Sequence, residues 1–311
     1  MSTAICSAPA KALSRSTPRL ISVLVPHFNQ MALLRLCLES LLSQRDVPAP
    51  IEIIVADNES PGGIQEVIDA FPTVIFLSVA ERGAACARNA AMKVAKGDVF
   101  AFIDADCVAD PAWIANGVTA LAEKDLIGGA VSVTAKNPRA MTPVESFEAV
   151  FAFHQKAYVE KKGFSVTANL FVRAETAKMI GWFTNGLSED REWCTRARAL
   201  GFCLAFSPTA KVCHPARRDF EELVQKWDRL VRERWNGLGS MGLKRRATWL
   251  ALTLATALSA GPHLARIALY QGGMSIRQRM EAALVLVRIR FWRAGRMMAF
   301  LTAREDCTPA V

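Results

Sequence analysis

Short apolar runs alternate with segments of helical periodicity over the first third of the chain, and this alternation limits the folds that it can adopt. The apolar runs cover residues 20–25, 51–55, 74–79 and 99–103. Runs of this kind are typical of strands buried on both faces. The segments between them that predict helices are residues 31–42, 64–70 and 83–96. Alternating strands and helices indicate βαβ units, so we predict an α/β fold with a mostly parallel sheet flanked by helices.

Two carboxylates follow the run at residues 99–103, in the sequence Asp104-Ala105-Asp106. Ligands of open α/β sheets bind at the carboxyl ends of strands, so this pair is expected to face a cleft. A pair of carboxylates suits a hard divalent ion such as Mg²⁺, which binds through one or two carboxylates and substrate phosphates. Taken alone, two acids after a strand are more often a helix cap or a solvated turn. Other polar residues also follow strand ends and would converge on the same rim: His27, Asn29 and Asp57.

The pattern changes after residue 111, where strands and helices become less regular. Helices are predicted over residues 111–122, 143–162 and 188–200, and strands over residues 126–133, 164–172, 202–206 and 210–213. Ser188 is a candidate N-cap, and Glu189 and Asp190 would then lie in the first helical turn. There they could simply interact favourably with the helix dipole. His214 follows the last short strand, and alone it would be an ordinary surface or core histidine.

The basic surplus of the chain is C-terminal. The net charge is +9, and residues 211–311 alone hold 18 Lys and Arg against 8 acids. Acidic lipid headgroups or nucleic acid are the partners that such a surplus favours. No nucleic-acid-binding motif is present, so we predict no nucleic-acid partner. The basic C-terminal hundred residues are instead expected to form a helical region that associates with an anionic membrane surface.

Two segments carry this membrane prediction. Residues 247–265 contain no acid, Lys or Arg, but their Thr, Gly and Pro content favours an interfacial or re-entrant hairpin over a full crossing. Farther on, apolar residues share one helical face and arginines lie off it. The apolar residues are Leu284, Val287, Phe291, Ala294, Met298 and Leu301, and the arginines are Arg288, Arg290, Arg293 and Arg296. A basic amphipathic helix suits a membrane surface, and the alternative is a helix that packs against the catalytic domain.

The termini and cysteines bear on localisation. Residues 1–19 lack the apolar core of a signal peptide, and we predict a flexible leader. The eight cysteines form no Cys-x-x-Cys pair, so neither a zinc site nor a disulfide framework is indicated. Both features favour a reducing, cytoplasmic location.

Five motifs occur in order along residues 20–216. They are Ile21-Ser22-Val23-Leu24-Val25-Pro26-His27-Phe28-Asn29, Ile53-Ile54-Val55-Ala56-Asp57-Asn58, Gly83 with Ala87-Arg88-Asn89, Phe102-Ile103-Asp104-Ala105-Asp106, and Ala168-Asn169 with Glu189-Asp190 and His214. Together they resemble the family 2 glycosyltransferases, inverting GT-A-fold enzymes that use nucleotide sugars. The resemblance implies a Rossmann-like GT-A domain over residues 20–216. Its donor half would be residues 20–110 and its acceptor half residues 111–216, with the basic helical region over residues 217–311.

The resemblance also implies a reaction. A hexosyltransferase of this kind would move a sugar from a nucleotide-sugar donor, expected to be a UDP-sugar, to a saccharide or lipid-linked saccharide acceptor. It would act in exopolysaccharide or cell-envelope glycan synthesis, peripheral to the inner face of the cytoplasmic membrane. The donor-nucleotide residues would be Pro26, Asn29, Asp57, Arg88 and Asp104, and the residues holding Mg²⁺ or Mn²⁺ would be Asp104, Asp106 and His214. Asp190 would be the catalytic base, with Asn169 and Glu189 on the acceptor side.

Departures from the family pattern leave the donor open. Phe28 stands where the family often has Tyr, and Ala56 and Asn58 replace the usual neighbours of Asp57. Two alternatives also stay open. One is a catalytically silent, membrane-tethered binding module on this fold. The other is a nucleotidyltransferase on a similar fold, although its opening loop would be expected to carry cations that Pro26-His27-Phe28-Asn29 lacks.

Overall fold

The computed structural model describes residues 16–186, 188–238 and 242–302, and these divide into two compact units. The first unit contains residues up to Ser132 together with Phe153–His214, and the second contains Val133–Ala152 together with the chain from Pro215. One of these divisions falls after His214, whereas the prediction ended the first domain at residue 216. The second unit also takes residues 133–152, which the prediction placed in the acceptor half. Most of the predicted leader, residues 1–15 of 1–19, lies outside the described residues.

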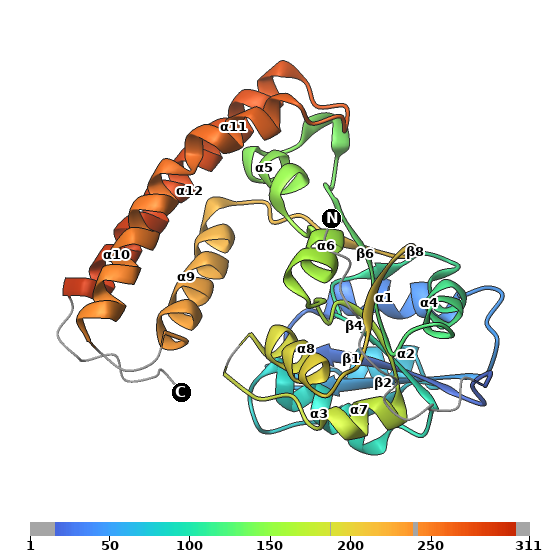
Figure 1. Ribbon diagram of the computed structural model, residues 1–311. Coiled ribbons are helices and arrows are strands. Elements are labelled where there is room, and N and C mark those ends of the chain that lie inside the picture. The colour runs from blue at the N-terminus through green and yellow to red at the C-terminus, as the bar shows by residue number, and fades with distance from the viewer. Residues whose placement is uncertain (1–15, 187, 239–241, 303–311) are drawn as a thin grey trace. The chain divides into compact units, whose positions relative to one another are not determined.

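The first unit is built on a mixed sheet (Figure 1). Its described strands are β1 (Ile21–His27), β2 (Ile51–Asp57), β3 (Ile75–Ser78), β4 (Val99–Ile103), β5 (Val108–Ala109), β6 (Leu126–Thr134), β7 (Asn169–Arg173) and β8 (Leu204–Pro215). They lie in the order β3-β2-β1-β4-β7-β6-β8-β5. The predicted parallel pairing holds among β1, β2, β3 and β4. Beyond β4 the recorded pairings are antiparallel, β4 with β7, β6 with β7 and β5 with β8.

Helices cover both faces of this sheet, as the α/β prediction requires (Figure 1). One hydrophobic core joins the sheet to α1 (Met31–Leu42), α2 (Gln65–Ala70) and α4 (Trp113–Leu121). The core on the opposite face joins it to α3 (Ala84–Val94), α7 (Ala174–Ile180) and α8 (Glu189–Ala199). Every residue of β4 is buried, which agrees with its continuous apolar run. The carboxyl ends of β1, β2 and β4 therefore leave this double core together, and the polar residues that follow them share one rim.

The structure differs from the sequence prediction at two elements. The helix predicted over residues 143–162 is broken into α5 (Pro143–Phe151), α6 (Gln155–Ala157) and a π-helical turn, η2 (Tyr158–Lys162). The break follows from Phe153, whose φ of 48° lies in the left-handed region and cannot continue a right-handed helix. The strands predicted at residues 202–206 and 210–213 are a single strand, β8. Pro208 lies within it, away from Val212 and Cys213, the residues that pair with β5.

The second unit is helical (Figure 1). Its described elements include α5, the short 3-10 helix η1 (Pro138–Ala140), α9 (Phe220–Asn236), α10 (Leu243–Leu258), α11 (Ala260–Ala268) and α12 (Ile276–Thr302). α12 is its centre and packs against α5, α9, α10 and α11. The predicted hairpin at residues 247–265 corresponds to most of α10 and the start of α11. Across the part of the chain that the structure describes, none of the helices combines the length and apolar character that a membrane crossing requires.

Candidate functional site

The ends of β1 and β2 hold a buried carboxylate in a fixed position. His27 and Asp57 are neighbours in the parallel register of the two strands. The His27 Nε2 atom accepts a hydrogen bond from the backbone N–H of Gln30 at 3.0 Å, so the proton lies on Nδ1 and is donated to Asp57 Oδ1 at 2.7 Å. Ser60 donates its hydroxyl to the same oxygen at 2.5 Å and its backbone N–H to Asp57 Oδ2 at 2.9 Å. Asp57 is thus oriented by three donors, and one lone pair of Oδ2 has no donor among them.

The loop after β1 is tied to the same group. The backbone N–H of Asn29 donates to Ser60 Oγ at 2.7 Å, and the φ of Asn29 is 53°, a left-handed conformation that Asn adopts more readily than most residues. The Asn29 side chain is exposed, and Pro26 is half-buried at the end of β1. The structure therefore brings Pro26, Asn29 and Asp57 together, as the sequence predicts.

Arg88 is a buried cation that joins three elements. It lies on α3, only 4% of its surface is exposed, and it donates to Asp104 Oδ1 at 2.8 Å and to Glu189 Oε1 at 3.0 Å. Burial lowers the pKa of Arg88, but Asp104, Glu189 and Asp190 more than offset this effect, so the guanidinium stays charged. Its Nε has no acceptor in the described structure. Arg88 thereby holds the acid after β4 close to the acid that begins α8.

The second acid of the Asp104-Ala105-Asp106 motif is close to a histidine. The Asp106 Oδ2 atom lies 3.1 Å from the Nε2 atom of His214, which comes from β8. The ring of His214 is buried against the ring of Phe153, with 4.8 Å between the ring centres. The structure therefore brings five of the sequence-predicted polar residues to the end of β4: Arg88, Asp104, Asp106, Glu189 and His214.

The Asp106–His214 geometry fits a divalent cation. Two adjacent ligands at about 2.0–2.1 Å from an octahedral ion lie roughly 3 Å apart, which matches the observed separation of 3.1 Å. Among the described residues no group of three or more His, Cys, Asp or Glu side chains forms a ready-made metal site. Such a group is not required, because Mg²⁺ commonly takes only one or two protein carboxylates and completes its shell with substrate phosphates and water.

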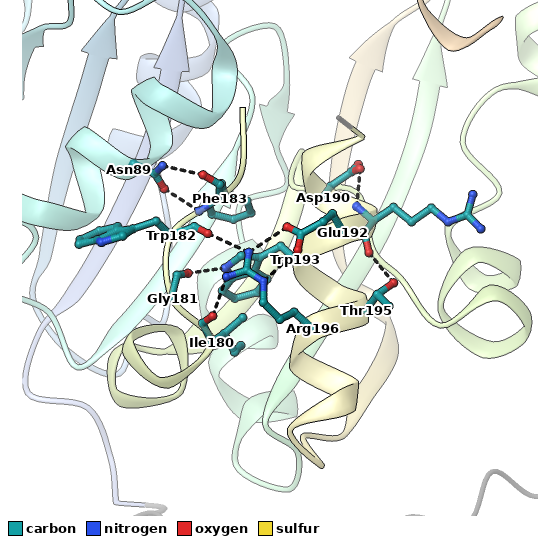
Figure 2. A network of polar contacts seen from close by, with 11 residues as sticks. Asn89, Ile180, Gly181, Trp182, Phe183, Asp190, Glu192, Trp193, Thr195 and Arg196 are labelled. Atoms are coloured by element: carbon teal, nitrogen blue, oxygen red, sulfur yellow. Dashed lines mark hydrogen bonds and ion pairs between the residues drawn. The ribbon is translucent and has the colours of Figure 1, made fainter. Parts of the chain in front are cut away.

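Asp190 lies in the first turn of α8 and has an unusual pKa. Its carboxylate is half-buried, and its Oδ1 accepts a hydrogen bond from the backbone N–H of Arg191 at 2.7 Å (Figure 2). Burial and the neighbouring Glu189 carboxylate raise the pKa of Asp190 to about 6, while the charge of Arg88 opposes the shift. A carboxylate with a pKa near 6 is a stronger base than an exposed one and still ionised at neutral pH.

A network of hydrogen bonds fixes the position of α8 (Figure 2). Arg196 donates to the carbonyl oxygens of Ile180 and Trp182, both at 2.8 Å, and pairs with Glu192 one turn earlier. The indole of Trp193 donates to the carbonyl of Gly181 at 2.8 Å. The segment 180–183 after α7 is therefore bound to the same helix that carries Asp190.

The same segment is also bound to α3 (Figure 2). The Asn89 side chain donates to the Phe183 carbonyl at 2.9 Å and accepts from the Phe183 N–H at 2.8 Å. Asn89 follows Arg88 directly, so neighbouring residues of α3 hold the start of α8 and the segment before it. Sequence reasoning did not assign roles to Asn89, Trp193 and Arg196. The Glu192–Arg196 spacing of four residues was a visible signal of a helix pair, but it did not point to the segment 180–183.

Asn169 and Ser188 have positions that the sequence did not reveal. Asn169 is fully buried at the start of β7, where its Oδ1 accepts from the indole of Trp113 at 2.9 Å. Its amide donates to the carbonyls of Ala130 and Ala210 at 2.9 and 3.0 Å. These bonds use both amide N–H groups of Asn169 and link β6, β7, β8 and α4. The evident role of Asn169 is therefore structural, and not contact with the saccharide acceptor. Ser188 precedes α8 as predicted, but its side chain makes no capping hydrogen bond.

Comparisons with known proteins agree with this fold. The family described as Glycosyl transferase family 2 matches residues 22–180, about half of the chain. Glycosyltransferase AglE of Haloferax volcanii is 29% identical over 309 residues, which cover 94% of this chain and 99% of that protein. A shorter match is UDP-Glc:alpha-D-GlcNAc-diphosphoundecaprenol beta-1,3-glucosyltransferase WfaP of Escherichia coli, 33% identical over 28% of this chain and 35% of its own length.

A solved structure shares the fold. A mannosyltransferase from Pyrobaculum calidifontis, in complex with GDP-Man and Mn²⁺, superposes with a TM-score of 0.58 over 92% of this chain and 87% of its own. Its sequence identity is 18%, so this likeness concerns the fold alone.

Proposed function

This chain belongs to glycosyltransferase family 2, and from that premise we propose that it transfers a sugar from a UDP-sugar to a saccharide or lipid-linked saccharide acceptor with inversion at the anomeric carbon. The observation that carries the proposal is the bridge made by Arg88. It joins Asp104, on the predicted donor side, to Glu189, which directly precedes the proposed base Asp190. A donor held at the ends of β1, β2 and β4 would thus lie beside a carboxylate of raised pKa.

Asp57 supports a uracil donor. Its Oδ1 already accepts from His27 and Ser60, and its Oδ2 accepts from the Ser60 backbone, so one lone pair is left for a ligand. Uracil presents a single ring N–H, at N3, which one acceptor satisfies. Guanine presents two adjacent N–H groups, which an open carboxylate would bind with both oxygens. The GDP-Man of the structurally similar mannosyltransferase is therefore a donor that we expect Asp57 to disfavour.

Asp190 is the proposed general base. It would accept the proton of the acceptor hydroxyl as the oxygen attacks the anomeric carbon opposite the leaving group. Direct displacement of this kind inverts the anomeric centre and requires one base and no covalent sugar intermediate. Arg88 would hold Asp104 and Glu189 in place during this step. The hydrogen bonds from Arg196 to the segment 180–183 would keep α8 from moving away from the sugar donor.

The proposed metal ligands are Asp104, Asp106 and His214. The chemistry that bound Mg²⁺ or Mn²⁺ would supply there is Lewis-acid neutralisation of the diphosphate. The carboxylate and imidazole donors suit Mn²⁺ at least as well as Mg²⁺, because imidazole is a ligand that transition metals prefer. Asp106 Oδ2 and His214 Nε2 lie 3.1 Å apart in direct contact, and a bound ion would replace this contact with two metal–ligand bonds.

Acceptor and location belong to the same proposal. The similarity to a transferase acting on a diphosphoundecaprenol-linked sugar favours a lipid-linked acceptor and a role in polysaccharide or envelope-glycan synthesis. In the second unit, α12 leaves several apolar side chains exposed, among them Leu284, Phe291 and Met298, and carries exposed Arg288 on the same helix. This combination supports peripheral binding to the inner face of the cytoplasmic membrane.

The proposal is tested with Asp190→Asn and a panel of nucleotide sugars. With Mn²⁺ present, a UDP-sugar should raise the melting temperature of the wild type and of the variant equally, because the donor residues are unchanged. The variant should lose transfer. Transfer at the wild-type rate would remove Asp190 as the base. If no donor gives transfer or hydrolysis in the wild type, the silent binding module is favoured, and release of diphosphate from a nucleoside triphosphate would favour a nucleotidyltransferase.

A further inference from the structure

The second unit contains a buried arginine without a counter-ion among the described residues. Arg293 lies on α12, and only 8% of its surface is exposed. Its guanidinium carbon is 3.7 Å from the centre of the Trp227 ring on α9. Within residues 16–186, 188–238 and 242–302 it has no hydrogen bond or ion pair, and its buried Nε has no acceptor. Since buried charges are normally paired, this arrangement requires an explanation.

Two further buried donors on α9 and α12 are also unsatisfied. Arg290 precedes Arg293 by three residues, so the two side chains lie on neighbouring positions of one helical face. The Nε of Arg290 and the indole Nε1 of Trp227 are both buried without an acceptor in the described structure. Three buried N–H donors on two packed helices therefore lack an acceptor, and Arg293 connects them, because it stacks on the Trp227 ring and lies three residues from Arg290.

The charged groups that shift the pKa of Arg293 are all positive. Burial, Arg290 and Arg234 lower the pKa of Arg293 to about 9, and no carboxylate contributes to the shift. Arg293 is therefore still charged at neutral pH. The nearest acid of α9 in sequence, Asp228, is occupied by Arg232 at 2.7 Å and by Arg296 at 2.6 Å. The seam between α9 and α12 thus has an excess of positive charge, and Asp228, which pairs with Arg232 and Arg296, forms no ion pair with Arg293.

We propose that Arg293, Arg290 and Trp227 bind a phosphate group between α9 and α12. A phosphate supplies both the negative charge and several acceptor oxygens, and the guanidinium fork is suited to bind it with two hydrogen bonds. This site lies in the helical unit, and it does not rest on the proposed sugar transfer or on any residue assigned to that reaction.

The surroundings favour a phosphate attached to a lipid. On a helix of 3.6 residues per turn, Val287 lies about 60° and Phe291 about 100° from Arg290 around the axis. Both are exposed apolar side chains of α12. Around α12, from the side that packs on α9 toward solvent, the order is therefore buried Arg293, half-buried Arg290, and then the exposed Val287 and Phe291. The phosphate of a lipid would bind the arginines, and its hydrocarbon chains would contact the neighbouring apolar side chains. A soluble phosphate would use the arginines alone.

The test uses the full chain and the variant Arg293→Met. The matched control for the thermal-shift measurements with soluble ions is Arg288→Met, which removes the same charge from the same helix. Arg288 also stacks on an aromatic ring, with its guanidinium 3.8 Å from the centre of Phe220, but it is exposed. The probes are inorganic phosphate and pyrophosphate, measured by thermal shift against chloride at equal ionic strength. Flotation with phosphatidylcholine vesicles, with and without phosphatidic acid, tests the lipid source.

Phosphate or pyrophosphate should raise the melting temperature of the wild type and of Arg288→Met, and Arg293→Met should lose this shift. Without phosphate, Arg293→Met should melt at the same or a higher temperature than the wild type, because it removes a buried unpaired charge. Arg290→Met, at a half-buried position, should weaken the response. Flotation that requires phosphatidic acid and is lost in Arg293→Met would assign the site to lipid phosphate, and a response to the soluble ions alone would assign it to free phosphate. A wild type indifferent to every probe, or an Arg293→Met variant with the full shift, would overturn the proposal.

Discussion

Replacing Asp190 with Asn should stabilise the protein at neutral and alkaline pH while it removes transfer. The native pKa of Asp190 is about 6, against an ordinary value of 3.8, and burial is the largest cause. The native state therefore binds this proton more tightly than the unfolded state, so the free energy of unfolding falls as the pH rises from about 4 to about 6 and is nearly constant above that range. The difference of about 2 pKa units corresponds to roughly 3 kcal/mol, at about 1.4 kcal/mol per unit. Asn stays neutral and avoids this penalty.

The pH dependence distinguishes this cause from an ordinary change in packing. Linkage predicts a gain of roughly 3 kcal/mol at pH 8, about half of that at pH 5 and almost none at pH 3, where both states of the wild type are protonated. At pH 8 this gain corresponds to a rise of about 6–12 °C in the melting temperature of a domain of this size. Thermal unfolding of wild type and variant across the pH range measures it. Glu123→Gln, at an exposed acid of the same unit, is the matched control and should change little.

Two results would refute the reasoning. If Asp190→Asn is less stable than the wild type at pH 8, the native site favours the charged carboxylate, and burial does not dominate its pKa. If the variant is more stable by the same amount at every pH, the gain does not come from a titrating group. Either outcome would also weaken the argument that Asp190 is a base with a pKa near 6.

Further predictions concern the same unit. Below about pH 6, kcat/KM should fall tenfold per pH unit as Asp190 is protonated, and it should level off above pH 7; a profile that is flat between pH 5 and pH 7 would contradict the assignment. Arg88→Met should lower the free energy of unfolding by about 2–3 kcal/mol in urea, because the two carboxylates it bridges lose their cation, and an unchanged midpoint would contradict the bridge. Asp106→Ala should abolish the Mn²⁺-dependent rise in melting temperature, and a retained rise would move the ion elsewhere. Arg196→Met should lower the free energy of unfolding by about 2 kcal/mol and should lower kcat more than it raises KM for the sugar donor. An unchanged kcat would mean that the hydrogen bonds of Arg196 have a purely structural role.

The sequence predicts the first half of the sheet well because its signals are local. The runs that form β1, β2, β3 and β4 are short, apolar and bounded by polar turns, and helix α1 begins and ends where its periodicity does. The break between α5 and α6 was not predictable, because it depends on the backbone conformation of Phe153. The transfer of residues 133–152 to the helical unit depends on tertiary packing, which periodicity does not report.

In the candidate site, too, local signals were predictable from the sequence and tertiary contacts were not. Asp57, Asp104 and Asp106 could be placed on one rim from the strand ends that they follow, whereas Arg88, on α3, was assigned to the site only by the family resemblance. Asn169 could not, because only the fold reveals that its amide is consumed by β6, β8 and Trp113. The unpaired state of Arg293 among the described residues was also hidden, since an arginine of an amphipathic helix is expected at the surface. Spacing along a chain indicates which residues share an edge or a face, whereas burial and partners depend on what packs against them.

The proposal that Asp190 acts as a base in a direct displacement is tested most directly by the stereochemistry of the product. Wild-type enzyme would be incubated with the nucleotide sugar that stabilises it, Mn²⁺ and an acceptor, and the anomeric configuration of the new linkage would be determined by NMR. A single base on the acceptor side predicts inversion, so an α-linked UDP-sugar should yield a β-linked product. A product of retained configuration would contradict direct displacement and with it the role proposed for Asp190.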